Sequence, residues 1–235
     1  MCLNNWGGID HKVLEFHEYV NLFSGKSGSG KSTVMDAIQV ILYGSFSPSF
    51  LNKAADDAKN RRSVLSYLRG EQKDGSANRK DCDFCSVMAL EIEDTGTHII
   101  TCIGIAFEVR KSDSEIKKFV YFSHSGKMPE SEYLTEQGVC YSNQEIKKLV
   151  SARTKSDDNR GKGEVNRIYG SKEAYLGTLY DVILGYIDQN RFITMEKSAI
   201  ALKMTNGTGQ FIRDYMFPKN TSNTIATISE QLDSY

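Results

Sequence analysis

The sequence predicts an α/β fold that includes an antiparallel β subdomain. Three observations support this prediction. A glycine-rich stretch at residues 25–32 lies between a short apolar run and a segment with helical spacing of apolar residues. Residues 86–124 contain three segments with strand character, separated by turns. The last residues, 221–235, place apolar side chains at the spacing of a coiled coil.

Length and composition limit the possible protein classes. The chain has 235 residues, which allows one large domain or two small ones. Hydrophobic residues make up 40% and charged residues 25%, as in ordinary globular proteins. The net charge is −1, so nucleic-acid binding would depend on a local basic patch. No apolar run approaches the ~18 residues of a membrane helix, and the N-terminus lacks the apolar core of a secretory signal.

The cysteines predict neither a disulfide framework nor a metal site. There are five, an odd number without framework spacing, so we expect reduced thiols in a cytoplasm: Cys2, Cys82, Cys85, Cys102 and Cys140. The pair at 82 and 85 forms a CxxC motif. A zinc site would need a second pair or two histidines at suitable spacing, and the sequence offers neither.

The stretch "GKSGSGKS", residues 25–32, fits the phosphate-binding pattern G-x-x-x-x-G-K-[ST], or Walker A, at every defined position. The apolar run "EYVNLFS" (residues 18–24) predicts a buried strand before it. The segment after it predicts a helix that ends at Gly44. The predicted order of strand, loop and helix is the one that this motif requires for binding a nucleoside triphosphate.

Each position of the loop has an expected role. Glycines let the backbone approach phosphate oxygens, and the amides of residues 27–32 together with the helix N-terminus attract the anion. We expect Lys31 to reach the β- and γ-phosphates as a catalytic residue, Ser32 to bind Mg²⁺, and Thr33 to contact the α-phosphate. The predicted nucleotide-binding residues are Gly25, Ser27, Gly28, Ser29, Gly30, Lys31, Ser32 and Thr33.

The other predicted elements follow in chain order. Residues 1–23 predict two short strands around the turn "WGGID", and a helix is expected near residues 61–68. Ser142 and Glu145 form a capping box before a helix. Residues 153–167 predict a charged loop. The helix expected at 171–185 places four apolar side chains on one face: Tyr175, Leu179, Val182 and Ile183.

Several stretches resemble one group of P-loop proteins. A GTPase is excluded because "NKAAD" (52–56) lies too close to the loop to be a guanine motif. "KSTVMDAI" (31–38) resembles the loop and first helix of the SMC, SbcC and MukB group of ABC-type ATPase heads. "SFLNKAADDAKNRRSVLSYLRGE" (49–71) and "FIRDYMF" (211–217) are similar to JetC, the SMC-like subunit family of Wadjet anti-plasmid systems. The resemblance covers most of the chain.

This resemblance implies the N-terminal lobe of an ABC-type head over residues 1–220 and the start of a coiled-coil arm over 221–235. Such heads are ATPases that use ATP and Mg²⁺ and need a Walker B acid and a signature loop. The acids in "VMALEIEDTG" (87–96), which are Glu91, Glu93 and Asp94, are predicted to be structural because they lie in an alternating strand and its turn. "NGTGQF" (206–211) only mimics a signature loop. We therefore expect a fragment that binds ATP but hydrolyses it poorly alone.

The resemblance also implies partners: the C-terminal half of the same head, a second head in a homodimer, DNA bound without sequence preference, and kleisin, winged-helix and nuclease subunits. It implies DNA translocation or loop extrusion in plasmid defence, in the cytoplasm near the nucleoid, with no membrane partner. Two alternatives stay open. One is an SbcC-like repair and recombination ATPase, and the other is a non-catalytic module in which ATP joins two heads.

Two further sets of site residues are weaker predictions. ABC-type heads use a glutamine that contacts Mg²⁺ and the attacking water, and Gln189 is the candidate, with Gln144 and Gln210 as competitors. A solvated glutamine is an equally good interpretation. Residues 53–80 hold eight basic residues against four acids, which predicts either DNA phosphate contacts or a solvated surface. The DNA-contact candidates are Arg61, Arg62, Arg69 and Lys73.

Overall fold

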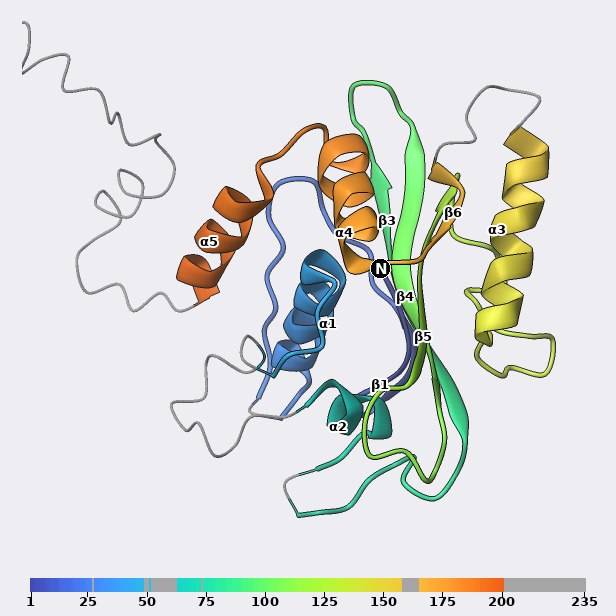
Figure 1. Ribbon diagram of the computed structural model, residues 1–235. Coiled ribbons are helices and arrows are strands. Elements are labelled where there is room, and N and C mark those ends of the chain that lie inside the picture. The colour runs from blue at the N-terminus through green and yellow to red at the C-terminus, as the bar shows by residue number, and fades with distance from the viewer. Residues whose placement is uncertain (27, 49–50, 52–62, 73, 158–164, 201–235) are drawn as a thin grey trace, which may run out of the picture. The chain divides into compact units, whose positions relative to one another are not determined.

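The computed structural model describes residues 1–26, 28–48, 51, 63–72, 74–157 and 165–200 (Figure 1). The chain divides into two compact units, Met1–Gln189 and Asn190–Tyr235. Of the second unit, only the helix α5 (Gln189–Ile200), which begins at the boundary, is described. The predicted domain division at residue 220, the coiled coil, "FIRDYMF", "NGTGQF" and Gln210 all lie outside the described residues.

The first unit contains one six-stranded sheet in the order β2-β1-β3-β4-β5-β6, and every neighbouring pair is antiparallel. The predicted meander is confirmed and shares this sheet with the two N-terminal strands. The strands are β1 (Cys2–Trp6), β2 (Ile9–Val13), β3 (Phe84–Glu93), β4 (Ile100–Val109), β5 (Lys118–Ser125) and β6 (Arg167–Tyr169).

Helices cover both faces of the sheet. Figure 1 shows α1 (Lys31–Tyr43) and α4 (Lys172–Gly177) on one side and α3 (Asn143–Asp157) on the other. Cross-strand pairing places one row of side chains toward α1 and α4: Leu3, Met88, Ile105, Tyr121 and Tyr169. The opposite row packs with α3 in a core that includes Cys2, Ala89, Phe122, Ile146 and Val150. The sheet therefore has an apolar core on each side.

The left-handed backbone of Asn5 turns the end of β1 toward α1. Strict alternation would place Trp6 on the α3 face with Cys2 and Asn4. Asn5 has φ 58°, a conformation that asparagine tolerates, and its side chain donates to the Cys85 carbonyl at 2.8 Å. Trp6 instead lies against α1, where its indole nitrogen donates to the Thr33 carbonyl at 2.8 Å.

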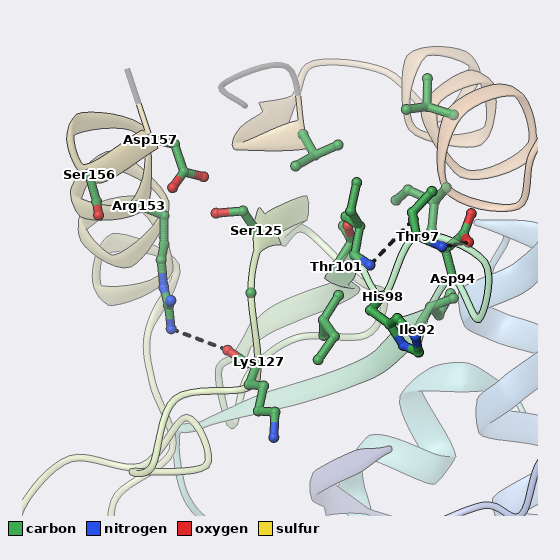
Figure 2. A pocket seen from close by; sticks show the side chains of 16 residues that line it. Ile92, Asp94, Thr97, His98, Thr101, Ser125, Lys127, Arg153, Ser156 and Asp157 are labelled. Atoms are coloured by element: carbon green, nitrogen blue, oxygen red, sulfur yellow. Dashed lines mark hydrogen bonds between the residues drawn. The ribbon is translucent and has the colours of Figure 1, made fainter. Parts of the chain in front are cut away.

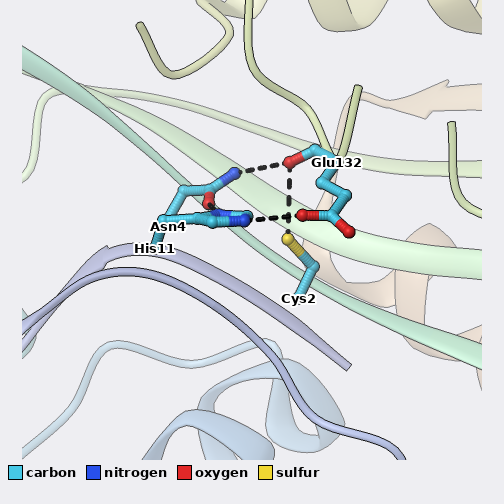
Figure 3. A network of polar contacts seen from close by, with 4 residues as sticks. All are labelled: Cys2, Asn4, His11 and Glu132. Atoms are coloured by element: carbon cyan, nitrogen blue, oxygen red, sulfur yellow. Dashed lines mark hydrogen bonds and ion pairs between the residues drawn. The ribbon is translucent and has the colours of Figure 1, made fainter. Parts of the chain in front are cut away.

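A polar network joins the N-terminal strands to the segment before α3 (Figure 3). The His11 ring nitrogens lie 2.5 Å from Asn4 Oδ1 and 2.6 Å from Glu132 Oε2. Asn4 Nδ2 donates to the Glu132 carbonyl at 2.8 Å, and the Cys2 thiol lies 3.5 Å from the same oxygen. The three contacts with Glu132 link residues more than 120 positions apart and hold the edge of the sheet in place.

The short helix α2 (Val64–Arg69) confirms the helix expected near residues 61–68. Ser63 caps it by accepting from the Ser66 amide, and Gly70 ends it with φ 65°. The capping box of α3 is also confirmed, since Ser142 and Glu145 bond each other's backbone amides. Residues 153–157, predicted to begin a loop, are the last turn of α3. The local charge pattern there did not reveal that the helix continues.

Three tyrosine hydroxyls bind carbonyls at the C-terminal end of α1 and at its Gly44 cap. Tyr175 donates to the Ile41 carbonyl and Tyr180 to the Leu42 carbonyl, both at 2.9 Å. Tyr121 donates to the Gly44 carbonyl at 2.5 Å. Helix C-termini leave carbonyls without intrahelical partners, and buried ones need such donors. The end of α1 is therefore fixed by β5, α4 and the segment after α4.

The predicted helix at 171–185 changes its winding midway. α4 is followed by a π-helical segment, η4 (Thr178–Ile183), in which the Leu184 amide donates to the Leu179 carbonyl at 2.8 Å. Wider winding rotates the later side chains, so Leu179 is buried while Val182 is 53% exposed. The prediction of one apolar face with Val182 on it is wrong, because it assumed α-helical spacing throughout.

The strand predicted immediately before the glycine loop, at residues 18–24, is absent. The Asn21 side chain bonds the backbone amide of His17 at 2.6 Å and its carbonyl at 2.8 Å, which gives a local turn. Tyr19, Val20 and Leu22 are 79%, 77% and 89% exposed. An apolar run forms a strand only beside a partner strand, and none pairs with this run among the described residues.

No helix in the described ranges is both long and apolar enough to span a membrane.

Candidate functional site

The N-terminus of α1 is open. The helix begins at Lys31 after Gly30, whose φ is 88°, and no side chain of the described residues caps it. The first turn contains no acidic residue. The first amides of a helix point outward and carry partial positive charge, so this end is suited to an anion such as phosphate.

Two glycines keep the loop surface accessible. Gly28 and Gly30 have φ of 82° and 88°, and a Cβ added at either would meet nothing within 4 Å. Gly25 differs, because a Cβ there would lie 2.6 Å from the Ser29 hydroxyl oxygen. The first glycine therefore permits close packing within the loop, and the other two permit its left-handed turns.

The Lys31 side chain folds over the loop. Its ammonium nitrogen donates to the Gly25 carbonyl at 2.6 Å, to the Lys26 carbonyl at 2.9 Å and to the Ser29 hydroxyl at 3.3 Å. The Lys31 ammonium therefore lies against the loop, within reach of phosphate oxygens that the loop would bind. Ser32 is exposed on the first turn of α1, and Thr33 is half-buried beside it. Ser27 lies outside the described residues.

A cavity of about 690 Å³ adjoins the loop, a size typical of ligand sites. Three chain segments surround it: the β1–β2 turn, the glycine loop with the start of α1, and the turn after α2. The lining residues are Gly8, Ile9, Gly28, Ser29, Gly30, Thr33, Gly70, Glu71, Gln72 and Asp74. Sequence reasoning predicted only the middle segment, because nothing local indicates that residues 8–9 and 70–74 face it.

The β1–β2 turn is held tightly against α1 and α2. A Cβ added at Gly7 would lie 2.6 Å from the Thr33 methyl carbon, so only glycine fits there without a shift. The Gly7 amide donates to the Tyr67 carbonyl at 2.8 Å. The Trp6 and Tyr67 rings stack with centroids 4.7 Å apart. This packing positions Thr33 at the wall of the cavity.

Arg79 connects two of the three walls, the β1–β2 turn and the α2 segment. Its side chain is buried, and it donates to the carbonyls of Gly7 and Leu68 and to Asp10 Oδ1, the last two at 2.9 and 2.8 Å. Burial lowers the pKa of Arg79, and the nearby Asp10 carboxylate opposes that shift. The guanidinium thus joins the β1–β2 turn to the end of α2, because it donates hydrogen bonds to both segments.

Asp36, part of the stretch that resembles SMC-like heads, has a structural position. It is 4% exposed on α1 and accepts a hydrogen bond from the Tyr67 hydroxyl. Since Tyr67 also stacks on Trp6, the carboxylate fixes α2 to α1 behind the cavity.

The acids considered as Walker B mimics are engaged elsewhere. Glu91 accepts from the Met128 amide at 2.6 Å, and Glu93 lies 3.0 Å from the ring of His98. Asp94 accepts from the amides of Gly96 and Thr97, which lowers the pKa of Asp94. Their positions in β3 and its turn support the structural interpretation.

Neither Gln189 nor Gln144 lines the cavity. Gln189 is the first residue of α5 and not a loop residue. Gln144 is exposed on α3, on the opposite face of the sheet from α1. Of the DNA-contact candidates, Arg61, Arg62 and Lys73 lie outside the described residues. Arg69 donates to the carbonyls of Lys111 and Asp113, and thus holds the β4–β5 connection against α2.

A second cavity, of about 660 Å³, lies between the β3–β4 turn and α3 (Figure 2). Arg153 faces it and donates to the Lys127 carbonyl at 3.2 Å, while Asp94 and Asp157 contribute carboxylates. Basic and acidic side chains both line this cavity, so its charge does not favour one class of ligand. Among the described residues, no cluster of three or more histidine, cysteine or acidic side chains could hold a metal ion, and Cys82 and Cys85 are both free thiols.

Comparison with known proteins agrees with this geometry. Residues 1–58 match the P-loop containing region of AAA domain. The match supports a P-loop nucleotide-binding region in this part of the chain. The match includes β1, β2, the glycine loop and α1, which supply two of the three walls of the cavity. A search of curated proteins found no match.

Proposed function

We propose that this chain binds ATP with Mg²⁺ and forms the ATP-binding half of an SMC-like head. The observation that carries the binding proposal is the open N-terminus of α1 with the Lys31 ammonium folded over the preceding loop. Both features provide positive charge at one place without an acidic residue in the first turn. Phosphate groups are the ligands that this arrangement favours.

The loop residues suit a magnesium–triphosphate complex. Lys31 would bind oxygens of the β- and γ-phosphates, and the exposed Ser32 hydroxyl would bind the metal ion. Amides of the loop would hold the remaining phosphate oxygens, since the Cβ positions of Gly28 and Gly30 face open space. Mg²⁺, when bound, neutralises charge on the phosphates.

We infer that hydrolysis needs a Walker B acid and a signature loop that the acids of β3 do not supply. The acids of β3 and its turn are engaged in structural contacts, and none of them lines the cavity beside the loop. The exposed apolar run Tyr19, Val20 and Leu22, directly before the loop, supports a site that another segment completes. We therefore propose a composite ATPase, completed by the C-terminal half of the head and by a second head.

The wider role is proposed from sequence resemblance. The stretches that resemble JetC favour an ATP-driven motor that moves along DNA or extrudes DNA loops in plasmid defence. It would act with kleisin, winged-helix and nuclease subunits. An SbcC-like repair ATPase is the alternative, and the type of nuclease that copurifies with the full complex would distinguish the two.

Binding of radiolabelled ATP to the purified chain tests the central proposal. Lys31→Ala should abolish binding, because it removes the ammonium from the loop. Lys147→Ala is a matched control, since Lys147 is exposed on α3, away from the cavity. Undiminished ATP binding by Lys31→Ala would overturn the assignment of the site.

A further inference from the structure

The wall of the cavity that the turn after α2 forms carries an acidic side chain, Glu71. We propose that Glu71 accepts hydrogen bonds from the ribose hydroxyls of the bound nucleotide, so that the site selects ribonucleotides over deoxyribonucleotides. This inference rests on the proposed function, because it assigns the part of the cavity that the phosphates do not occupy.

The direction of the cavity supports this assignment. Thr33 lines the cavity and Ser32 does not. Successive residues of an α-helix point about 100° apart, so the cavity extends to the side of α1 that Thr33 faces. The expected metal ligand, Ser32, faces elsewhere. The cavity therefore leads away from the metal position and can take the nucleoside part of the ligand.

The two carboxylates of this wall differ in what they already bind. Asp74 accepts from the Ser76 amide at 2.9 Å and from the Ser76 hydroxyl at 2.6 Å, and both bonds lower the pKa of Asp74. Glu71 is half-buried, and its carboxylate makes no hydrogen bond or ion pair with the described residues. An ionised carboxylate repels phosphate but accepts strongly from hydroxyl groups, and ribose offers two adjacent ones.

The backbone holds Glu71 rigidly. Gly70 has φ 65°, and a Cβ there would lie 2.6 Å from the Gly7 carbonyl oxygen. The Glu71 amide donates to the Ser66 carbonyl at 3.0 Å, and Glu71 forms a bridge with Ala77. A fixed backbone limits the positions that the Glu71 carboxylate can reach, which favours discrimination between ligands that differ by one hydroxyl.

The experiment compares ATP with 2′,3′-dideoxy-ATP as competitors of radiolabelled ATP on the full chain. Wild-type protein should prefer ATP by about tenfold, the value of a charge-assisted hydrogen bond. Glu71→Ala should weaken ATP binding by about tenfold and leave dideoxy-ATP binding unchanged. Glu115→Ala is the matched control, since Glu115 is exposed in the β4–β5 connection and does not line the cavity.

Each other outcome has a distinct meaning. Equal binding of the two nucleotides by wild-type protein would overturn the role of Glu71 while leaving ATP binding in place. A preference retained by Glu71→Ala would do the same, and the wild-type comparison holds even if that variant misfolds. Inorganic tripolyphosphate separates the two proposals. If wild-type protein binds neither ATP nor tripolyphosphate, the proposed function itself fails and this inference fails with it.

Discussion

The Tyr67 hydroxyl donates a hydrogen bond to the Asp36 carboxylate between α2 and α1, directly behind the nucleotide cavity. Both side chains are buried. The bond joins the helix that follows the glycine loop to the helix that leads into the Glu71 wall. This buried polar contact therefore helps to hold the two walls together.

Removing that contact should destabilise the protein. Tyr67→Phe deletes a buried hydrogen bond to a charged acceptor, and we expect a loss of about 1–3 kcal/mol in the free energy of unfolding. Urea denaturation followed by circular dichroism measures this. Tyr141→Phe is the control, because the Tyr141 hydroxyl bonds Ser131 in an exposed position, and it should cost less than about 0.5 kcal/mol. Equal losses in the two variants would contradict the prediction.

Gly7→Ala should damage both stability and nucleotide binding. The new Cβ would meet the Thr33 methyl group and would also occupy a backbone position with φ 58°. We expect a cost of about 1–3 kcal/mol and weaker ATP binding, because Thr33 or the β1–β2 turn must move.

The control for this variant is Gly170→Ala, where a Cβ meets nothing within 4 Å. It should leave both thermal stability and ATP affinity near wild-type values. If Gly7→Ala behaves in the same way, the turn does not position Thr33.

His124 should make stability depend on pH. Burial lowers the pKa of His124 from 6.5 to about 4, and the neutral ring fits its contacts with the Ser125 carbonyl at 3.0 Å and the Tyr133 hydroxyl at 2.9 Å. The unfolded chain takes up the proton first as the pH falls. The contribution of His124 is therefore complete above pH 6.5 and is lost between about pH 6.5 and pH 4, with a maximum near 3 kcal/mol.

The measurement is urea denaturation of wild-type protein and His124→Gln at several pH values. The difference in unfolding free energy between them should shrink as the pH falls from 7 to about 4.5. His17→Gln is the control, because His17 is exposed and takes no part in the contacts of His124. A constant difference for His124→Gln would refute the assignment.

Purified chain alone should bind ATP without appreciable turnover. Glu91 and Asp94 are engaged in structural contacts, and the proposed composite site requires a second head. A phosphate-release assay should give the same background rate for wild-type protein and Lys31→Ala. Turnover by wild-type protein that Lys31→Ala abolishes would show that this chain holds a complete catalytic site, and would exclude the non-catalytic alternative.

Sequence patterns predicted the elements that local physics determines. The glycine loop and α1 follow from glycine spacing and helical periodicity, and the capping box of α3 follows from Ser142 and Glu145. The β3–β5 meander follows from strand-forming segments separated by turns. These signals lie within a few residues of the structure that they specify, which explains why they were reliable.

The failures depend on distant or unusual geometry. The apolar run at 18–24 predicted a strand, but strand formation needs a partner that no local pattern reveals. The π-helical turn of η4 displaced Val182 from the expected face. The Glu71 wall was missed because it approaches the glycine loop only through the docking of Gly70 against Gly7.

The two ends of α1 have different partners, because, among the described residues, tyrosine hydroxyls bind only its C-terminal end. Its N-terminus faces the candidate phosphate position, and its C-terminus is anchored by Tyr121, Tyr175 and Tyr180. A ligand at the loop would therefore contact the N-terminus of a helix whose C-terminus is already held by hydrogen bonds. Such a helix resists displacement along its axis, so a displacement of the loop would be transmitted to β5 and the segments around α4.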